Sequence, residues 1–275
     1  ALISLGHFAE AERYSHWIQT IVQNASAHYQ PVYKINGDEI ITETELTLEG
    51  YQGDQPVRVG NDAYKQIQHD VYGQMLLSLE PLYTDLRVYK SNSRPSIKLI
   101  DEILDRILSV MDTPDAGIWE FRSILQKHAE SYLFHWAGAN AALKIAKFAK
   151  EESIEKKSLE VIRLAEENIE KCYNHERLAY GCSQENKNLN ASEFLLVTMG
   201  FLKDPEKASN HIRALEEELK ISKELIYRYR NLDDFGETRS TFLICGFWYA
   251  EALAKINEVE KAREVFEALL KHSNH

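Results

Sequence analysis

Apolar residues recur at three- and four-residue spacing along most of this chain, which places them on one face of a helix. The clearest case follows Ser96, a helix-capping residue, where positions 97, 100, 103, 104, 107, 108 and 111 are all apolar. Helices are predicted over residues 8–23, 61–79, 97–111, 123–150, 153–172, 191–202, 205–222, 240–255 and 259–272. The pattern therefore predicts an all-α protein.

The predicted helices are of two kinds. Residues 241–253 are apolar nearly all round, which is typical of a helix buried on every side, whereas residues 259–270 are apolar on one face and should lie outside. Inner helices that alternate with outer ones form either a closed double ring or an open solenoid. No regular repeat of about 34 residues is present, and long loops are foreign to such arrays, so we favour the closed ring.

Two segments between the helices carry other signals. Residues 24–60 form a long irregular stretch rich in Gly and Pro, and loops of this length in a compact domain are usually functional. Residues 227–230 are predicted to be a short extended piece, followed by a polar loop through Gly236.

Composition narrows the function classes. The 275 residues carry a formal net charge of -11, which argues against a nucleic-acid partner. No apolar run reaches the roughly 18 residues of a membrane span, so no membrane partner is expected. Cys172, Cys182 and Cys245 are widely separated, without metal spacing, and no other Cys/His cluster occurs. We therefore expect a reduced, cytoplasmic protein without a metal site.

The stretch from Gly117 to Arg122 places a carboxylate, Glu120, directly after Trp119 and between two helical segments. A carboxyl held against an indole is poorly solvated, which favours its protonated form. This is the setting that a general acid needs near neutral pH. The alternative is a solvated glutamate in a surface loop.

Several blocks along the chain closely resemble glycoside hydrolase family 15, the family of glucoamylases that also includes glucodextranases and some trehalases. The blocks are Gly50–Asn61, then Gln66, Gln68 and Asp70–Gly73, then Gly117–Glu120, Tyr227–Tyr229, Thr241–Trp248 and Glu251–Ala254. They occur in the order of the family, and together they span nearly the whole chain.

The resemblance implies a toroid of six inner and six outer helices, with the active site in a funnel at one end. It implies that Glu120 is the general acid and that Trp119 forms a wall of the sugar site. Arg228 would bind glucose hydroxyls, although an ion pair with a neighbouring aspartate is the alternative. Tyr51 and Arg58 would line the same funnel. The implied chemistry uses no metal and no cofactor.

Residues 1–275 are then expected to be the central part of a single catalytic domain that is incomplete at both ends. The chain begins at Ala1 without an initiator Met. The catalytic base of the family, a Glu beyond the last outer helix, is expected outside this chain, so residues 1–275 alone are expected to lack hydrolase activity.

Two positions depart from the family pattern. Glu130-Ser131-Tyr132 replaces a His-Ser-Lys run in the helix after the acid, and Asn140 stands where an Asp is common. The first change replaces positive charge by negative charge near the site, so the detailed structure of the site and its substrate can differ from those of the family.

We interpret the chain as an exo-acting inverting α-glucoside hydrolase of the glucoamylase type, which releases glucose from the non-reducing ends of α-glucans. One alternative is a trehalase or isomalto-oligosaccharide hydrolase of the same family. Another is a non-catalytic sugar-sensing or interaction domain. The sequence leaves open the linkage, the substrate length and the oligomeric state.

Overall fold

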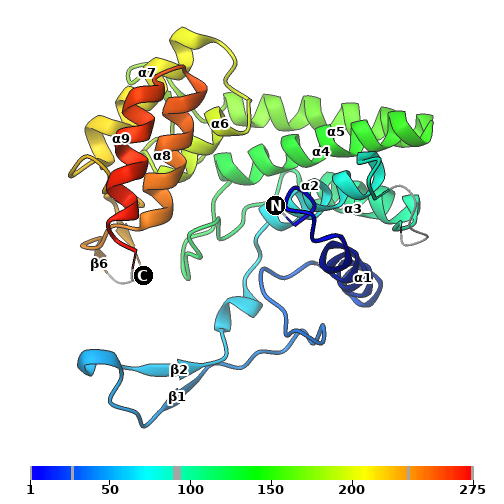
Figure 1. Ribbon diagram of the computed structural model, residues 1–275, viewed down its shortest axis with the longest axis horizontal. Coiled ribbons are helices and arrows are strands. Elements are labelled where there is room, and N and C mark those ends of the chain that lie inside the picture. The colour runs from blue at the N-terminus through cyan, green and yellow to red at the C-terminus, as the bar shows by residue number, and fades with distance from the viewer. Residues whose placement is uncertain (1, 26–27, 89–93, 234–235, 274–275) are drawn as a thin grey trace. The chain divides into compact units, whose positions relative to one another are not determined.

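The computed structural model of the chain describes residues 2–25, 28–88, 94–233 and 236–273 (Figure 1). The α-helices are α1 (Phe8–Asn24), α2 (Asp70–Thr84), α3 (Ile97–Val110), α4 (Ala129–Ala149), α5 (Glu152–Glu170), α6 (Phe194–Thr198), α7 (Pro205–Leu219), α8 (Leu243–Lys255) and α9 (Val259–Leu270). Short 3-10 helices are η1 (Tyr51–Gly53), η2 (Asp62–Lys65) and η3 (Ala191–Glu193). The strands are β1 (Thr44–Leu46), β2 (Val57–Val59), β3 (Tyr173–Asn174), β4 (Ala179–Tyr180), β5 (Leu232–Asp233) and β6 (Gly236–Glu237).

Helices dominate and the strands are two or three residues long, which confirms the prediction of an all-α protein. The closed ring of inner and outer helices stays a prediction. Within the described residues, no helix is long and apolar enough to cross a membrane.

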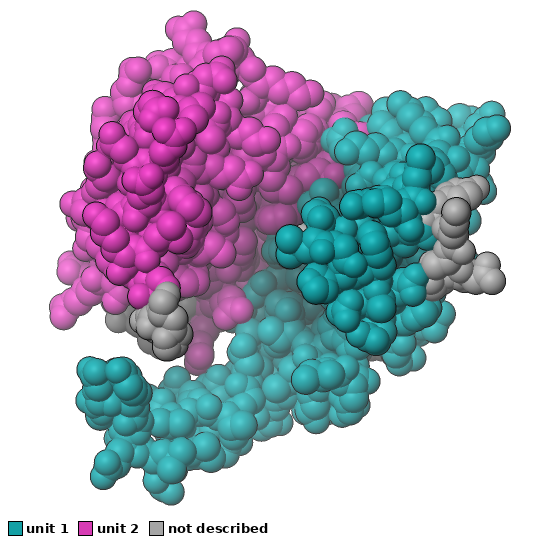
Figure 2. All heavy atoms as spheres, in the orientation of Figure 1, with its two compact units in different colours: residues 1–110, 138–161 teal, residues 111–137, 162–275 magenta. Residues whose placement is uncertain are grey.

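The chain forms two compact units, coloured separately in Figure 2. Unit 1 consists of residues 1–110 and 138–161, and unit 2 consists of residues 111–137 and 162–275. Helices α4 and α5 each contribute residues to both units.

Unit 1 is built around α1, α2 and α3, which pack against one another. Their buried faces carry the side chains that the apolar pattern placed there, including the fully buried Ile100, Ile103 and Ile107 of α3. A Cβ on Gly138 of α4 would lie 2.6 Å from the Cα of Gly73 in α2. These two helices therefore cross so closely that only glycine fits at the contact.

The helix predicted to start at Asn61 is in fact two helices. The Asn61 side chain accepts a hydrogen bond from the Ala63 N–H at 2.9 Å and so caps only η2. Gln66 then adopts an extended backbone, with φ -81° and ψ 151°. As a result α2 begins at Asp70 and continues to Thr84, beyond the predicted end.

The described part of the stretch 24–60 is mostly irregular, as predicted, but it contains the antiparallel pair β1–β2. Arg58 on β2 lies opposite Glu45 on β1. A Cβ on Gly60, which has φ +84°, would lie 2.1 Å from the Thr42 carbonyl oxygen. Glycine is thus required where the chain leaves this pair.

Unit 2 is organised around α8, which packs against α9 and α6. The rings of Phe194 on α6 and Tyr249 on α8 are 5.4 Å apart, and neither side chain is exposed. Gly246 permits a close approach of α9, because a Cβ there would lie 2.7 Å from the Leu269 side chain.

The prediction that α8 is buried on every side is wrong for the described chain. Leu243, Ile244 and Phe247 are 38–41% exposed. The described elements that pack on α8, chiefly α6 and α9, cover only part of its circumference, which leaves an apolar face open.

The predicted start of α4 at Ser123 is also wrong, since the helix begins at Ala129. The residues before it are extended: Gln126 forms an antiparallel bridge with Asp115, and His128 forms one with Ser183. These long-range backbone pairings replace the helical hydrogen bonds that local propensity favoured.

Candidate active site

The turn that carries Glu120 is fixed by backbone geometry. Gly117 has φ +67°, and the Glu120 N–H donates to the Gly117 carbonyl at 3.1 Å. A Cβ on Gly117 would lie 2.9 Å from both Glu130 Oε1 and the His128 ring, so the turn lies directly against these buried side chains. The Ile118 N–H donates to Glu130 Oε1 at 3.4 Å. Glu130 therefore stabilises the turn through this hydrogen bond and its contact with Gly117.

Glu120 itself has φ +58°, in the left-handed region, and its side chain is exposed. Trp119 is only 8% exposed. The expectation that the indole encloses the Glu120 carboxyl is therefore wrong for the described residues, because the Glu120 side chain is open to solvent.

The Trp119 ring lies in an aromatic cluster. Its centroid is 6.2 Å from that of Tyr229, 6.5 Å from that of Phe242 and 5.9 Å from that of Trp248. The Arg228 guanidinium carbon lies 5.9 Å from the centroid of the Trp119 ring, within the range of a cation–π contact. Segments far apart in the chain are thus brought together beside Glu120.

Arg228 is half-buried and its guanidinium lies over Tyr229 as well, at 5.3 Å. It lines an open hollow of about 560 Å³ together with Asp233 and residues 236–240. Asp233 accepts a hydrogen bond from the Tyr229 hydroxyl at 2.7 Å. Asp234, the other aspartate considered as an ion-pair partner, lies outside the described residues. The hollow thus places the donors of Arg228 and Arg239 beside the carboxylates of Asp233 and Glu237.

Tyr51 and Arg58 belong to unit 1, whereas Trp119, Glu120 and Arg228 belong to unit 2. Tyr51 is 81% exposed. Arg58 pairs with Glu43 at 3.2 Å and with Glu45 at 3.0 Å. The structure therefore brings together Trp119 and Arg228 beside Glu120, and the convergence of Tyr51 and Arg58 on them stays a prediction.

The departure at Glu130-Ser131-Tyr132 lies in the interior of unit 2, where the three side chains are 1%, 4% and 3% exposed. The Ser131 hydroxyl donates to Asp115 at 2.9 Å. Glu130 accepts from the Ile118 N–H of the Gly117–Glu120 turn, and Ser131 holds Asp115 just before that turn.

A second buried carboxyl, Glu193, was not singled out from the sequence. It accepts hydrogen bonds from the Asn190 N–H at 2.6 Å and from the Ser192 hydroxyl at 2.9 Å. Burial, followed by the nearby charge of Glu130, raises the pKa of Glu193 well above its usual value. The spacing of Asn190 and Glu193, which is that of a helix-capping box, is the sequence signal that would have found it.

Glu193 also fixes the segment that carries Arg228. The Ala191 N–H donates to the Arg228 carbonyl at 2.7 Å, and Asn190 forms an antiparallel bridge with Tyr229. Because Glu193 closes the 190–193 turn, it positions the backbone on which Arg228 stands. Glu130 thus supports the turn that carries Glu120, and Glu193 supports the segment that carries Arg228.

The cysteines are buried free thiols, at positions 172, 182 and 245. Among the described residues, no group of three or more His, Cys, Asp or Glu side chains is arranged to hold a metal ion.

Comparison with known proteins shows the family to which this chain belongs. The family model described as glycosyl hydrolases family 15 matches residues 1–274. The chain belongs to this family, as its motif blocks indicated.

Several relatives are named trehalase. The trehalase of Thermoplasma volcanium is 27% identical over 277 residues, covering 100% of this chain and 44% of that protein. The trehalase of Mycobacterium tuberculosis is 30% identical over 277 residues, with coverages of 98% and 40%. Trehalase 1 of Sulfolobus acidocaldarius is 26% identical over 279 residues, with coverages of 99% and 47%. The chain spans less than half the length of these relatives.

Proposed function

We propose that the protein carrying this chain hydrolyses an α-glucoside and that its substrate is trehalose. The observation that supports this most directly is the placement of Glu120 beside the Trp119–Arg228 contact, in a chain of a glycosyl hydrolase family. The relatives named trehalase favour trehalose over the α-glucans expected first from the sequence. Glucoamylase-type hydrolysis remains the alternative.

Each residue has a chemical role in this proposal. Glu120 protonates the glycosidic oxygen as the bond to the leaving sugar breaks. Trp119 forms a wall against the apolar face of the ring, and Arg228 donates hydrogen bonds to sugar hydroxyls. Tyr51 and Arg58 line the approach. The exposure of Glu120 leaves its carboxyl accessible to a substrate.

An inverting hydrolase needs a second carboxylate that activates water on the opposite face of the sugar. The two carboxyls of such enzymes are about 6.5–9.5 Å apart, which leaves room for that water. We assign this base to no residue of 1–275 and expect it elsewhere in the protein. The two-carboxyl mechanism itself calls for neither a metal nor an organic cofactor.

The experiment uses the purified protein that carries this chain, with trehalose, maltotriose and isomaltose as substrates and glucose release as the signal. The Glu120→Gln variant keeps the side-chain size but removes the proton donor. We expect trehalose to be hydrolysed fastest and Glu120→Gln to lower kcat by about 10²-fold or more.

The matched control is Glu160→Gln, because Glu160 is an exposed residue of α5 and should leave the rate unchanged. Preferential release from maltotriose would contradict the trehalose assignment. Full activity of Glu120→Gln would contradict the role of Glu120. A protein inactive on all three sugars would instead support the non-catalytic sugar-sensing or interaction domain.

The cytoplasmic location expected from the sequence also stays a prediction.

A further inference from the structure

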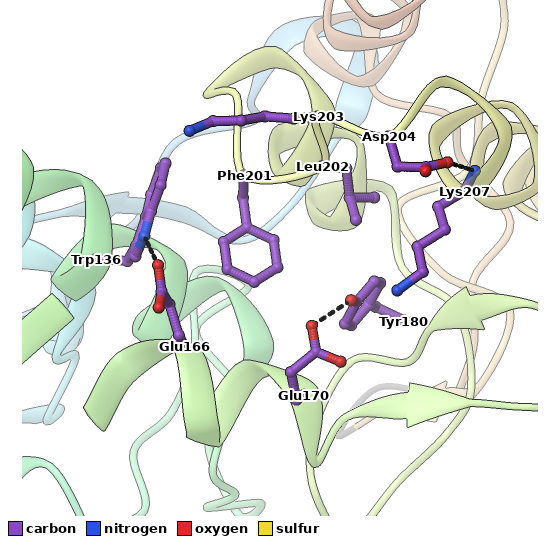
Figure 3. Close-up of a pocket in the computed structure, with 9 residues that line it drawn as sticks. All are labelled: Trp136, Glu166, Glu170, Tyr180, Phe201, Leu202, Lys203, Asp204 and Lys207. Atoms are coloured by element: carbon purple, nitrogen blue, oxygen red, sulfur yellow. Dashed lines mark hydrogen bonds between the residues drawn. The ribbon is translucent and has the colours of Figure 1, made fainter. Parts of the chain in front are cut away.

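A second hollow, of about 390 Å³, opens in unit 2 between α4, the end of α5, β4 and the loop before α7 (Figure 3). Sites for small ligands typically enclose roughly 300–1,000 Å³, so the hollow has room for one small molecule. It shares no lining residue with the hollow around Arg228.

Three aromatic rings form the walls of this hollow. Phe201 stands at its centre in Figure 3 and is half-buried. Trp136 meets the Phe201 ring edge-on, with centroids 5.4 Å apart and an interplanar angle of 89°. Tyr180 meets it at 6.1 Å and 84°. Trp136 and Tyr180 are almost fully buried, so they hold Phe201 in place and Phe201 presents the open ring surface.

Two carboxylates fix the flanking rings. Glu166 accepts a hydrogen bond from the Trp136 indole N–H at 3.0 Å, and Glu170 accepts one from the Tyr180 hydroxyl at 2.7 Å. A carboxylate has about four acceptor positions, and both side chains are exposed, so each keeps acceptor capacity toward the hollow. The acceptors are therefore oriented before any ligand arrives, which lowers the entropic cost of binding.

Lys203 and Lys207 bring donors to the same hollow. In Figure 3 the Lys203 side chain runs above the rings. The remaining charged residue, Asp204, is engaged at the start of α7, where it accepts the Lys207 N–H at 2.9 Å. With Asp204 the lining carries three carboxylates and two ammonium groups, an excess of one negative charge. An anionic ligand would be repelled here, whereas a neutral polyhydroxyl molecule uses the donors and acceptors together.

We propose that this hollow is a second sugar site, which holds one pyranose unit of a glucoside. The apolar face of the sugar lies on Phe201, its hydroxyls donate to Glu166 and Glu170, and Lys203 donates to a sugar oxygen. The choice of a glucosyl unit rests on the proposed function, and the balance of donors, acceptors and ring surface comes from the hollow itself.

The Trp136 indole N–H reports directly on this hollow, because it is hydrogen-bonded to Glu166 at its edge. The experiment follows its ¹H–¹⁵N signal in the labelled protein, with Trp136→Phe used only to assign the signal. Glucose is the titrant because it is not hydrolysed. We expect a saturable shift of the Trp136 signal.

Lys203→Ala tests the contact. Lys203 is exposed and lies in a loop, so its truncation leaves the fold intact. We expect the Kd for glucose, read at Trp136, to rise about tenfold, as for the loss of one hydrogen bond to a charged group. Lys156→Ala makes the same charge change on an exposed residue of α5 outside the hollow and should leave the Kd unchanged.

The proposal is overturned if glucose produces no saturable shift at Trp136, or if Lys203→Ala and Lys156→Ala bind equally well. It is also overturned if tetramethylammonium, and not glucose, saturates the signal, since that would make the hollow a cation site. Trehalose turnover without a Trp136 shift contradicts this site alone. A glucose-dependent shift in a protein that hydrolyses no glucoside supports the site and contradicts the proposed function.

Discussion

Replacing Glu193 with glutamine removes a buried ionisable group that closes the 190–193 turn, whose backbone is hydrogen-bonded to that of Arg228. Glu193 is 1% exposed and accepts hydrogen bonds from the Asn190 N–H and the Ser192 hydroxyl. Its pKa is raised well above the usual 4.5, first by burial and then by the charge of Glu130. The folded state therefore binds the Glu193 proton more tightly than the unfolded state does.

The sign of the pH effect follows from this difference. A carboxyl with a raised folded pKa contributes its full stability below the unfolded pKa, here 4.5, and loses it as the pH rises to the folded value. Between those limits the free energy of unfolding falls by about 1.4 kcal/mol per pH unit. The glutamine of the Glu193→Gln variant cannot titrate, so the variant lacks this slope. Its amide oxygen can accept only one of the two hydrogen bonds that Glu193 accepts, so losing the other should lower the free energy of unfolding by about 1 kcal/mol.

Burial also shifts the pKa values of the groups around Glu193. His211, whose ring contacts the Glu193 carbonyl at 2.9 Å, has its pKa lowered by burial to about 4. Burial raises the pKa values of Cys172 and Cys182 far above the usual thiol range. The part of the slope that Glu193→Gln removes is therefore assigned to Glu193, whose proton is held by burial and by the nearby charge of Glu130.

The assay is urea unfolding followed by circular dichroism at pH 5, 6, 7 and 8, for the parent and for Glu193→Gln. The stability of the parent relative to the variant should fall with rising pH. Glu217→Gln, an exposed change on α7, should follow the parent at every pH. A stability difference between parent and Glu193→Gln that is constant across this range would refute the reasoning.

Three further predictions concern the site and the core. Gly117→Ala should lower the free energy of unfolding by about 1–3 kcal/mol in urea titrations, because the added Cβ strains the left-handed backbone and clashes with Glu130. The control Gly200→Ala should lower it less, because Gly200 is also left-handed but has open space around it. Arg228→Lys keeps the charge but loses the planar contact with Trp119, so KM for trehalose should rise about tenfold; an unchanged KM would contradict its sugar-binding role. Burial raises the pKa of Cys245 to about 12, so iodoacetamide at pH 8 should label this thiol only after unfolding, as read by mass spectrometry; rapid labelling of the native protein would contradict that burial.

Local pattern predicted the helices well where one face is apolar and the ends carry capping residues. Helix α3 begins directly after Ser96, whose hydroxyl accepts the Lys98 N–H at 3.3 Å, and α7 begins after Asp204, which caps it. Residues 123–128 were predicted as helix and are extended, because their partners, Asp115 and Ser183, are set by tertiary structure. Pairings of this kind leave no local signal in the sequence.

The candidate site divides in the same way. The adjacency of Trp119 and Glu120 is visible in the sequence, and the contact with Arg228 was anticipated only through the family resemblance. The exposure of Glu120 was considered only as the alternative, and its left-handed backbone, which a glutamate seldom adopts, leaves no signal in the sequence. Glu193 was missed because its capping-box spacing marks the start of a helix but does not show that the carboxyl is buried.

The most direct test of the central claim is the anomeric form of the first glucose released from α,α-trehalose, followed by ¹H NMR before mutarotation. Inversion gives equal amounts of β-glucose, from attack of water, and α-glucose, from the leaving sugar protonated by Glu120. The account predicts this equal ratio, together with a loss of both signals in Glu120→Gln. Release of α-glucose alone, or unchanged release by Glu120→Gln, would contradict it.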